Sequence, residues 1–548
     1  MTRQTLTMLL TLLALGPWCL GDSVPATKPR LAATPPMGWN SWEAFRKDFD
    51  EEALKAQADA MVQLGLRDAG YAYFVIDGGW KTSDRDPAGS LVVDPKKFPH
   101  GMKALADYLH ERGLKLGLHQ PAGVKDCGHD EPGSQGNEER DAALFASWGV
   151  DLIKYDQCDF VHDPQRTPGA PDLDKVVVRR ANQVVFDSEA EAPQNRLTGL
   201  VRIEDRPRCS GGKCVAGIGY ADGGVEIPDV SVPESGRYTL DVGFAYPYYG
   251  QNRDRFKQMT LFVSLNGGPR QRIDIPYAIP KRYTTGTVSI DVDLNQGNNV
   301  ILLDNPLSQE EDVRLAYVKM ATALQRTGRP ILFSTSGAPR PWLWAGPIAH
   351  LWRTSDDISN QWKASILATV DRQAETLPYA GPGFWADPDM LEVGTKPHRA
   401  PRGSRTSAMT VTEQWSQFSL WAIMNAPLFI STDLRHLSDE SKSILINREV
   451  IAINQDPLGV AGQRIRNEGD VQVFAKRLTD GEAVALLNRG DAPAEIRVTT
   501  AELGFDKSAF EARDLWTGDS QPITDGVIRA TVEPHGVAML RMHTDGHR

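Results

Sequence analysis

The sequence is poor in cysteine, lacks any acceptor for N-linked glycosylation and, beyond its N-terminal segment, has no apolar run long enough to cross a bilayer. It holds five cysteines, of which Cys19 lies in that segment and four remain, namely Cys127, Cys158, Cys209 and Cys214. None of these belongs to a Cys-x-x-Cys pair or stands beside clustered histidines, which argues against a zinc site. Four cysteines suffice for two disulfides in an oxidising compartment. The missing Asn-x-Ser/Thr acceptors disfavour an N-glycosylated eukaryotic protein.

The chain also has fewer basic than acidic residues, which gives it a formal net charge of −11 at pH 7. Such a balance argues against nucleic acid or an anionic membrane as partner and suits a neutral ligand. Apolar residues at 41% and charged residues at 24% are ordinary globular values. At 548 residues the chain is too long for one core, so we expect two to four domains. The sequence does not determine the oligomeric state.

The N-terminus reads as an export signal. Arg3 precedes an apolar run from Leu6 to Leu20, and Gly21, Asp22 and Ser23 follow. The run is too short and wrongly flanked for a membrane anchor. We therefore expect residues 1–22 to be a signal peptide and the protein to be secreted or periplasmic.

Two stretches, 30–165 and 316–460, alternate between strand and helix patterns. Apolar strand-like runs include Tyr71–Asp77, Leu114–His119, Pro330–Thr335, His350–Thr354 and Pro427–Ser431, and amphipathic helical segments such as Glu138–Trp148 separate them. This alternation predicts a parallel sheet with crossover helices. Seven or eight strands are enough for an α/β fold of the (β/α)8 TIM-barrel type.

Two other stretches have the pattern of β-sandwiches. Residues 184–315 interrupt the alternation with short strands such as Leu261–Leu265, which ends at the turn Asn266-Gly267-Gly268. Residues 463–546 return to short β runs, for example Val471–Phe474 and Ala483–Leu487. The sequence thus predicts a β-sandwich domain inserted into the barrel and a C-terminal antiparallel β-sandwich domain.

Carboxylates stand at the ends of three expected strands. Asp156 ends the run Val150–Cys158, Asp77 ends another, and Asp356-Asp357 follow a third. Strand tips carry the chemistry in barrel enzymes, and paired carboxylates suit glycoside hydrolysis. An aspartate at such a position can equally cap a turn or be solvated. The nearby tryptophans Trp39, Trp42, Trp80 and Trp385 offer faces for a sugar ring, although tryptophan is also an ordinary core residue.

A set of motifs, in order, resembles glycoside hydrolase family 27, the α-galactosidases and α-N-acetylgalactosaminidases. The motifs are Pro36-Met37-Gly38-Trp39-Asn40-Ser41-Trp42, Lys154-Tyr155-Asp156, Trp352-Arg353-Thr354-x-x-Asp357, Asp387-Pro388-Asp389-Met390-Leu391, Leu420-Trp421-Ala422-Ile423-Met424 and Ile453-Asn454-Gln455-Asp456-Pro457. The resemblance implies a retaining mechanism that needs no cofactor, with Asp156 as nucleophile and Asp357 as acid/base. It also implies that Lys154 and Arg353 hold sugar hydroxyls and that Trp42 stacks on the ring.

The residues that would read the sugar depart from the galactosidase pattern. Asp77-Gly78-Gly79 stands where those enzymes have two consecutive aspartates, and His119 begins the segment that replaces a Tyr-Ser-Asp. Ser336 stands where galactosidases have a glutamate that recognises the 2-hydroxyl, and where N-acetylgalactosaminidases have a serine. Losing one charged hydrogen bond costs about 1.5–3 kcal/mol, enough to redirect specificity.

The insertion resembles a carbohydrate-binding module of family 35. The matching stretches are Phe186-Asp187-Ser188-Glu189-Ala190-Glu191, Cys209-Ser210-Gly211-Gly212-Lys213-Cys214 and Val232-Pro233-Glu234-Ser235-Gly236. The resemblance implies that Glu189 and Glu191 hold a structural calcium, although they can simply be solvated glutamates. Cys209 and Cys214 are close enough in sequence to close a small loop. Cys127 and Cys158 match a family 27 disulfide beside the nucleophile.

These observations favour a retaining exo-glycosidase acting on an oligosaccharide or polysaccharide, most simply an α-galactosidase. A second hypothesis keeps the chemistry and shifts the sugar, to that of a β-L-arabinopyranosidase, an α-N-acetylgalactosaminidase or an isomaltodextranase. A third is a carbohydrate-binding protein without catalysis, against which the presence of both Asp156 and Asp357 argues.

Overall fold

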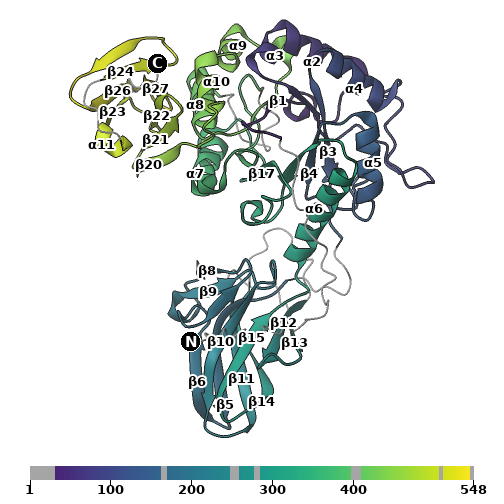
Figure 1. Ribbon diagram of the computed structural model, residues 1–548, viewed down its shortest axis with the longest axis vertical. Helices are drawn as coiled ribbons and strands as arrows, with labels where there is room; N and C mark the ends of the chain where they lie inside the picture. The colour runs from purple at the N-terminus through teal and green to yellow at the C-terminus, as the bar shows by residue number, and fades with distance from the viewer. Residues whose placement is uncertain are drawn as a thin grey trace, which may run out of the picture.

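The computed structural model describes residues 31–161, 169–246, 258–276, 284–396, 409–504 and 510–543. The expected signal peptide lies outside these residues. Figure 1 shows a barrel with helices around it, a β-sandwich attached to one end of the barrel through α6 and a second sandwich beside α7, α8 and α10. Within the described residues no helix is both long and apolar enough to span a bilayer.

The barrel is one sheet of eight parallel strands, in the order β18-β17-β16-β4-β3-β2-β1-β19. A parallel bridge between Leu391, just after β18, and Ile430 of β19 brings the two ends of the sheet together. The strands are β1 (Met37–Asn40), β2 (Tyr73–Ile76), β3 (Lys115–Pro121), β4 (Leu152–Asp156), β16 (Leu332–Ser336), β17 (Leu351–Arg353), β18 (Trp385–Asp387) and β19 (Leu428–Ile430).

Helices separate the barrel strands along the chain. They include α1 (Trp42–Phe45), α2 (Glu51–Gln63), α3 (Leu66–Ala69), α4 (Gly101–Glu111), α5 (Glu138–Trp148), α6 (Gln309–Arg326), α7 (Leu367–Thr376), α8 (Val411–Ile423), α9 (Asp439–Leu445) and α10 (Arg448–Asn454). Local signals set their ends: the Asp50 side chain caps α2, and Thr410 and Glu413 form a capping box at α8. The expected (β/α)8 barrel is confirmed. Strand β1 was missed because it is four residues long and sits inside a motif without alternation.

The inserted sandwich consists of two antiparallel sheets, ordered β13-β12-β15-β10-β7 and β14-β11-β5-β9-β8, with β6 paired to β5. Its strands are β5 (Asp172–Arg180), β6 (Gln183–Glu189), β7 (Arg196–Thr198), β8 (Arg202–Asp205), β9 (Lys213–Ala216), β10 (Gly224–Val232), β11 (Gly236–Ala245), β12 (Gln258–Leu265), β13 (Gln271–Pro276), β14 (Thr285–Leu294) and β15 (Gly297–Asp304). Inward-facing residues such as Val176, Leu240 and Ile301 form a core separate from that of the barrel.

The expected boundaries of the insertion need correction. Position 184 lies inside β6 and position 316 lies inside α6. Strand β5 was missed because aspartate, lysine and arginine interrupt its apolar residues, and the start of α6 was missed because 309–312 is entirely polar. The sandwich therefore begins at β5 and ends at β15.

The C-terminal domain has a six-stranded antiparallel sheet, β20-β21-β22-β27-β24-β25, and a two-stranded one, β23-β26. Its elements are β20 (Gln463–Glu468), β21 (Val471–Leu478), β22 (Gly481–Asn488), β23 (Ala494–Thr499), α11 (Thr500–Leu503), β24 (Phe510–Asp514), β25 (Ser520–Ile523), β26 (Val527–Val532) and β27 (Val537–His543). One face of the larger sheet, including Ala483, Ala485 and Leu487, belongs to the same apolar cluster as the barrel core. This domain therefore buries apolar surface directly against the barrel, as the expected β-sandwich.

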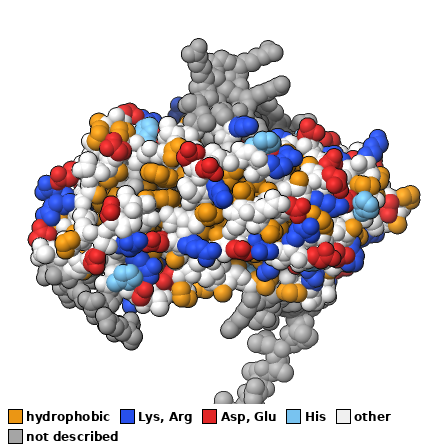
Figure 2. Space-filling view, turned by 90° about the horizontal axis from the view of Figure 1, so that it is seen from above, with side chains coloured by type: hydrophobic (Ala, Val, Ile, Leu, Met, Phe, Trp, Pro, Cys, Tyr) orange, Lys and Arg blue, Asp and Glu red, His pale blue; other side chains and the backbone are white. Residues whose placement is uncertain are grey.

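Charge is spread over the surface. On the face seen in Figure 2, basic and acidic side chains alternate over short distances. Both disulfides that the cysteine count allows are present, joining Cys127 to Cys158 and Cys209 to Cys214. The first joins positions 31 residues apart and the second positions only 5 apart.

The longer disulfide should stabilise the protein more than the shorter one, because closing a longer loop removes more entropy from the unfolded chain. We expect Cys127→Ala/Cys158→Ala to lower the free energy of unfolding by about 3–4 kcal/mol and Cys209→Ala/Cys214→Ala by about 2 kcal/mol. Denaturant unfolding of both double variants measures the difference. Equal losses, or a larger loss for the short loop, would contradict this explanation.

Candidate active site at the carboxyl end of the barrel

Polar side chains converge where the barrel strands end. They surround a small cavity of about 30 Å³, room for one or two water molecules. The lining residues are Asn40, Val75, Leu152, Lys154, Ser334, Ser336, Leu351, Arg353, Asp387, Asp389, Met390 and Phe429. Seven of these residues are polar or charged, so the position suits a ligand held by several hydrogen bonds at once.

Asp156, the last residue of β4, is held among cationic groups. Its Oδ2 lies 3.3 Å from Nε2 of His119, and its side chain is 22% exposed. Burial raises the pKa of Asp156, but the hydrogen bond from His119 and the positive charges of His119, Lys154 and Arg353 outweigh burial and bring that pKa to about 2. The carboxylate is therefore ionised throughout the ordinary pH range and can act as a nucleophile.

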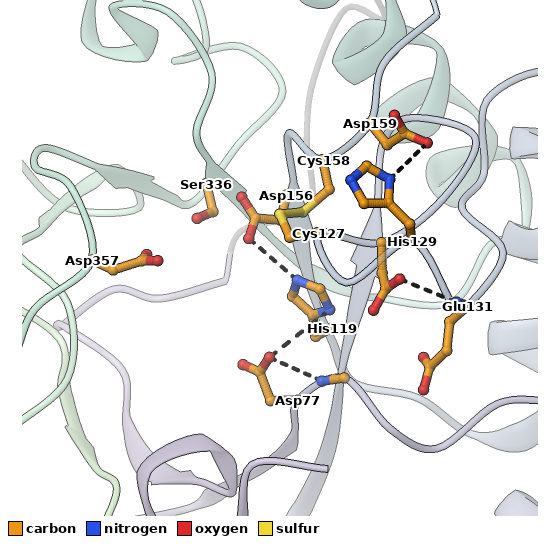
Figure 3. The surroundings of a disulfide bond; sticks show 12 residues. Asp77, His119, Cys127, His129, Glu131, Asp156, Cys158, Asp159, Ser336 and Asp357 are labelled. Carbon is orange, nitrogen blue, oxygen red and sulfur yellow. Dashed lines mark hydrogen bonds and ion pairs between the residues drawn. A yellow bond between two sulfur atoms is a disulfide. The ribbon is translucent and has the colours of Figure 1, made fainter. Parts of the chain in front are cut away.

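Asp77 follows β2 and is the centre of a buried hydrogen-bond network. Its Oδ2 accepts bonds from Nζ of Lys154 at 2.9 Å and from Nδ2 of Asn40 at 3.1 Å, and Oδ1 lies 3.9 Å from Nδ1 of His119. Burial raises the pKa of Asp77, but Lys154 and His119 hold it well below its usual value. His119 thus stands between Asp77 and Asp156, as Figure 3 shows.

Arg353, the last residue of β17, binds two carboxylates. Its Nη2 lies 2.9 Å from Oδ1 of Asp357 and 2.5 Å from Oδ2 of Asp389. Arg353 and Asp389 are buried, whereas the side chain of Asp357 is 96% exposed. In Figure 3 the carboxyl groups of Asp357 and Asp156 point toward the same space, with Ser336 between them. The structure thus brings both expected catalytic carboxyl groups to one mouth.

Ser336 ends β16 beside Asp156, with which it is in register. Its carbonyl oxygen accepts hydrogen bonds from the amide of Gln157 at 3.1 Å and from the hydroxyl of Tyr317. The next residue, Gly337, has φ of +71°. A Cβ there would lie 3.1 Å from Oδ1 of Asp156, so the backbone itself forms the wall beside this carboxylate.

Of the four tryptophans considered for sugar binding, one is half-buried and three are fully buried. Trp42 is half-buried, with the guanidinium of Arg46 4.9 Å from its ring centre. Trp385 is fully buried at the amino end of β18, where its indole N–H donates to the carbonyl of Ala32. Trp385 was wrongly expected to bind substrate, because its ring packs in the floor of the barrel, at the opposite end from the carboxylates. Trp39 and Trp80 are likewise buried in the core.

Three polar residues of the site were quoted in motifs without a role of their own. Asn40 holds Asp77, Asp389 holds Arg353, and Asp387 lines the cavity. Asp389 has φ of +82°, an unusual conformation for aspartate, and its carboxylate accepts the amides of Ile358 and Met390. Burial and neighbouring Asp389 raise the pKa of Asp387, which Arg353 opposes. The Asp-x-Asp spacing at the end of a short strand was the available signal.

Two groups of potential metal ligands lie among the described residues. His119 and Asp156 lie near Cys158, but the sulfur of Cys158 is bonded to Cys127 and is not a thiolate. In the insertion, Oε1 of Glu189 accepts the hydroxyl of Ser210 at 2.7 Å. Oε2 of Glu189 and Oε2 of Glu191 are buried without a hydrogen-bond partner. Two unsatisfied carboxylate oxygens at one end of the sandwich have the chemistry of a hard-cation site.

Comparisons with known proteins agree with the motifs. A family model described as alpha galactosidase A matches residues 34–199 and 283–456. A second, described as the alpha galactosidase C-terminal beta sandwich domain, matches 468–542. The unmatched stretch 200–282 lies within the inserted sandwich.

Individual relatives match along nearly the whole chain. Alpha-galactosidase A of Cellvibrio japonicus (strain Ueda107) is 31% identical over 537 residues, covering 94% of this chain and 93% of the relative. Alpha-galactosidase 2 of Arabidopsis thaliana is 32% identical over 516 residues, covering 93% and 90%. The crystal structure of alpha-galactosidase I from Mortierella vinacea superposes with a TM-score of 0.63 at 25% identity, covering 93% and 97%. The chain therefore belongs to the α-galactosidase family of retaining glycoside hydrolases, glycoside hydrolase family 27.

Proposed function

We propose that the protein is an exported exo-glycosidase that removes terminal α-D-galactosyl residues, or residues of closely similar shape, through a covalent glycosyl-Asp156 intermediate. The observation that carries this proposal is the convergence of Asp156 and Asp357 at one barrel mouth. Lys154 pairs with Asp77, Arg353 pairs with Asp357 and Asp389, and the charges of both cations keep Asp156 ionised. Export is supported by the two disulfides.

The proposed reaction has two steps. Asp156 attacks the anomeric carbon while Asp357 gives its proton to the departing glycosidic oxygen. Asp357, now a carboxylate, takes a proton from water, and the water oxygen attacks the anomeric carbon and releases Asp156. Arg353 contacts Asp357 and holds its carboxyl group in place for both steps. Lys154 and Asp77 hold sugar hydroxyls beside the nucleophile, and neither step needs a cofactor.

The sugar preference depends on a position without a side chain. A Cβ at Gly78 would meet only Cε of Lys47, at an ordinary contact distance of 3.7 Å. Unlike Gly79, whose φ is +107°, Gly78 does not have a left-handed backbone. The backbone therefore accepts a side chain here, and the absence of the second aspartate leaves Asp77 and His119 to recognise this side of the sugar.

Restoring that aspartate should sharpen the preference for galactose. We expect wild-type protein to hydrolyse nitrophenyl α-D-galactopyranoside and to accept the β-L-arabinopyranoside, which lacks the C6 arm. Gly78→Asp should raise the ratio of kcat/KM values for these substrates, galactoside over arabinoside, by about tenfold or more, because a charged hydrogen bond is worth about 1.5–3 kcal/mol. Initial rates on both glycosides measure this ratio. Initial rates on the α-N-acetylgalactosaminide test whether Ser336 determines which substituent is accepted at C2 of the sugar.

Gly78→Asn controls for the added volume, since it has the same shape without the charge. Asp156→Asn supplies the blank and should abolish turnover while the fold persists. An unchanged ratio in Gly78→Asp would refute the specificity argument. Absence of turnover on every glycoside, with binding retained, would favour α-glucans as substrates or the carbohydrate-binding alternative.

His119 should determine the acid limit of activity. His119→Phe removes both a hydrogen bond and a positive charge from Asp156, so the pKa of Asp156 should rise from about 2 toward and above its ordinary value. A nucleophile with a lower pKa stays ionised at lower pH, so the acid limb of the kcat/KM profile should move to higher pH in the variant. His119→Tyr, which keeps a donor without the charge, should give an intermediate shift. Identical acid limbs in all three proteins would rule out this role.

We propose further that the insertion is a carbohydrate-binding module similar to family 35, with a structural calcium held by Glu189 and Glu191. Asp174 adjoins them, since its Oδ1 accepts the amide of Ser210 at 2.8 Å. Burial and the neighbouring carboxylates raise the pKa of both Glu191 and Asp174. This excess of negative charge would be balanced by a divalent cation.

Calcium should stabilise the wild-type protein through this cluster. We expect calcium to raise the melting temperature relative to chelator, and Glu189→Gln/Glu191→Gln to abolish the response. Differential scanning calorimetry with calcium, magnesium or chelator measures it. Glu234→Gln is the matched control, since Glu234 is an exposed residue of the same domain that pairs with Arg180, and it should keep the wild-type response. A wild-type protein indifferent to calcium would eliminate the site.

A further inference from the structure

The position of the insertion in the barrel brings it to the catalytic face. It follows β4, which ends at Asp156, and the chain returns to the barrel through α6. It is therefore an enlarged loop between the fourth strand and its helix, and such loops surround the active site in this fold. Figure 1 shows α6 extending from the barrel, with the sandwich lying beyond the amino end of this helix. Because its core is separate, polar contacts at the junction fix how it sits.

One turn of the insertion, residues 217–223, makes those contacts. Three backbone hydrogen bonds of 2.7–3.1 Å close this turn. The amides of Gly219, Tyr220 and Gly223 donate to the carbonyls of Gly223, Gly217 and Tyr220, respectively. A Cβ at Gly219 would lie 2.1 Å from the carbonyl of Asn305, so the turn packs without space against the start of the return segment. The hydroxyl of Ser308 donates to the carbonyl of Gly219, and the carboxylate of Glu311 accepts the amide of Ala221.

The other side of this turn holds the loop after β16. The hydroxyl of Tyr220, a fully buried residue, donates to the carbonyl of Pro339, which also accepts the indole N–H of Trp344 at 2.9 Å. Arg340 donates to the carbonyl of Leu200 at 2.7 Å, and its guanidinium lies 4.7 Å from the ring centre of Tyr220. Arg340 has φ of +40°, a conformation that a non-glycine residue keeps only where its surroundings impose it.

The same loop forms the wall beside the nucleophile. Ser336 and Gly337 come three and two residues before Pro339, and the carbonyl of Ser336 binds the amide next to Asp156. A Cβ at Gly337 would lie only 3.0–3.2 Å from atoms of Asp156 and Gln157, so the loop packs closely against both residues. A shift of the loop at Pro339 would therefore change the space beside Asp156, and a displacement of about 1 Å can cost a hundredfold in rate.

We propose that the inserted domain is a positioning element of the active site, in which Tyr220 and Arg340 hold the loop 336–340 against the nucleophile. The domain thereby contributes to catalysis and to discrimination at the sugar carbon that Ser336 faces, in addition to any sugar binding of its own. This inference rests on the proposed function for the role of Asp156, but its structural part, the hold on the loop, does not.

Tyr220→Phe tests the proposal because it removes the hydroxyl and keeps the ring beneath Arg340. We expect faster amide hydrogen exchange in peptides covering 336–344, a fall in kcat/KM of about three- to tenfold carried mainly by kcat, and a changed ratio of galactoside to N-acetylgalactosaminide turnover. Tyr238→Phe is the matched control, since that buried hydroxyl also donates to a carbonyl, of Glu234 at 2.7 Å, within the insertion but away from the turn. It should leave all three measurements at the wild-type value.

Arg340→Gln provides a second variant, with the same expected directions. The proposal would be overturned if amide exchange in 336–344 were unchanged in both Tyr220→Phe and Arg340→Gln. It would also be overturned if Tyr238→Phe changed the three measurements as much as Tyr220→Phe does. Failure of the proposed function is distinguishable, because wild-type protein would then show no glycosidase activity while the exchange experiment still reports whether Tyr220 holds the loop.

Discussion

The site depends on the pairing of two cations, the half-buried Lys154 and the buried Arg353, with two buried carboxylates, Asp77 and Asp389. Burying either charge alone would be costly, and removing one partner of such a pair destabilises a protein by about 3–5 kcal/mol. The residues come from or just after β2, β4, β17 and β18, so the pairing ties distant parts of the barrel together. It also leaves positive charge near Asp156, which keeps this half-buried carboxylate ionised.

The two added domains relate differently to this mouth. The C-terminal sheet packs on the flank of the barrel, where Asp371 of α7 accepts bonds from Arg464, Gln472 and Arg489. The inserted sandwich occupies a loop of the catalytic face and touches the barrel through a polar turn rather than an apolar surface. The first arrangement supports the wall of the barrel, and the second reaches the residues beside Asp156.

Much of this arrangement could be predicted from the sequence. Alternating strand and helix patterns gave the barrel, and carboxylates at strand ends, with Lys154 and Arg353 in matching motifs, indicated most of the site. Trp385 was misplaced because proximity to Asp387 in sequence does not say which end of a strand a ring occupies. The boundary of the insertion was misplaced because β5 mixes charges with valines. The contact of Tyr220 with Pro339 joins positions 119 residues apart and leaves no local pattern to detect.

The separate cores of the molecule determine how sequence change can spread through it. The apolar cluster of the barrel continues into the C-terminal sheet, so a substitution at Leu487 also weakens the packing of the barrel. The cluster around Leu240 is confined to the inserted sandwich. The sequence of the sandwich strands far from the turn 217–223 can therefore change without affecting the barrel. Substitutions in this turn, by contrast, must be matched by substitutions in the loop 336–340 that it holds.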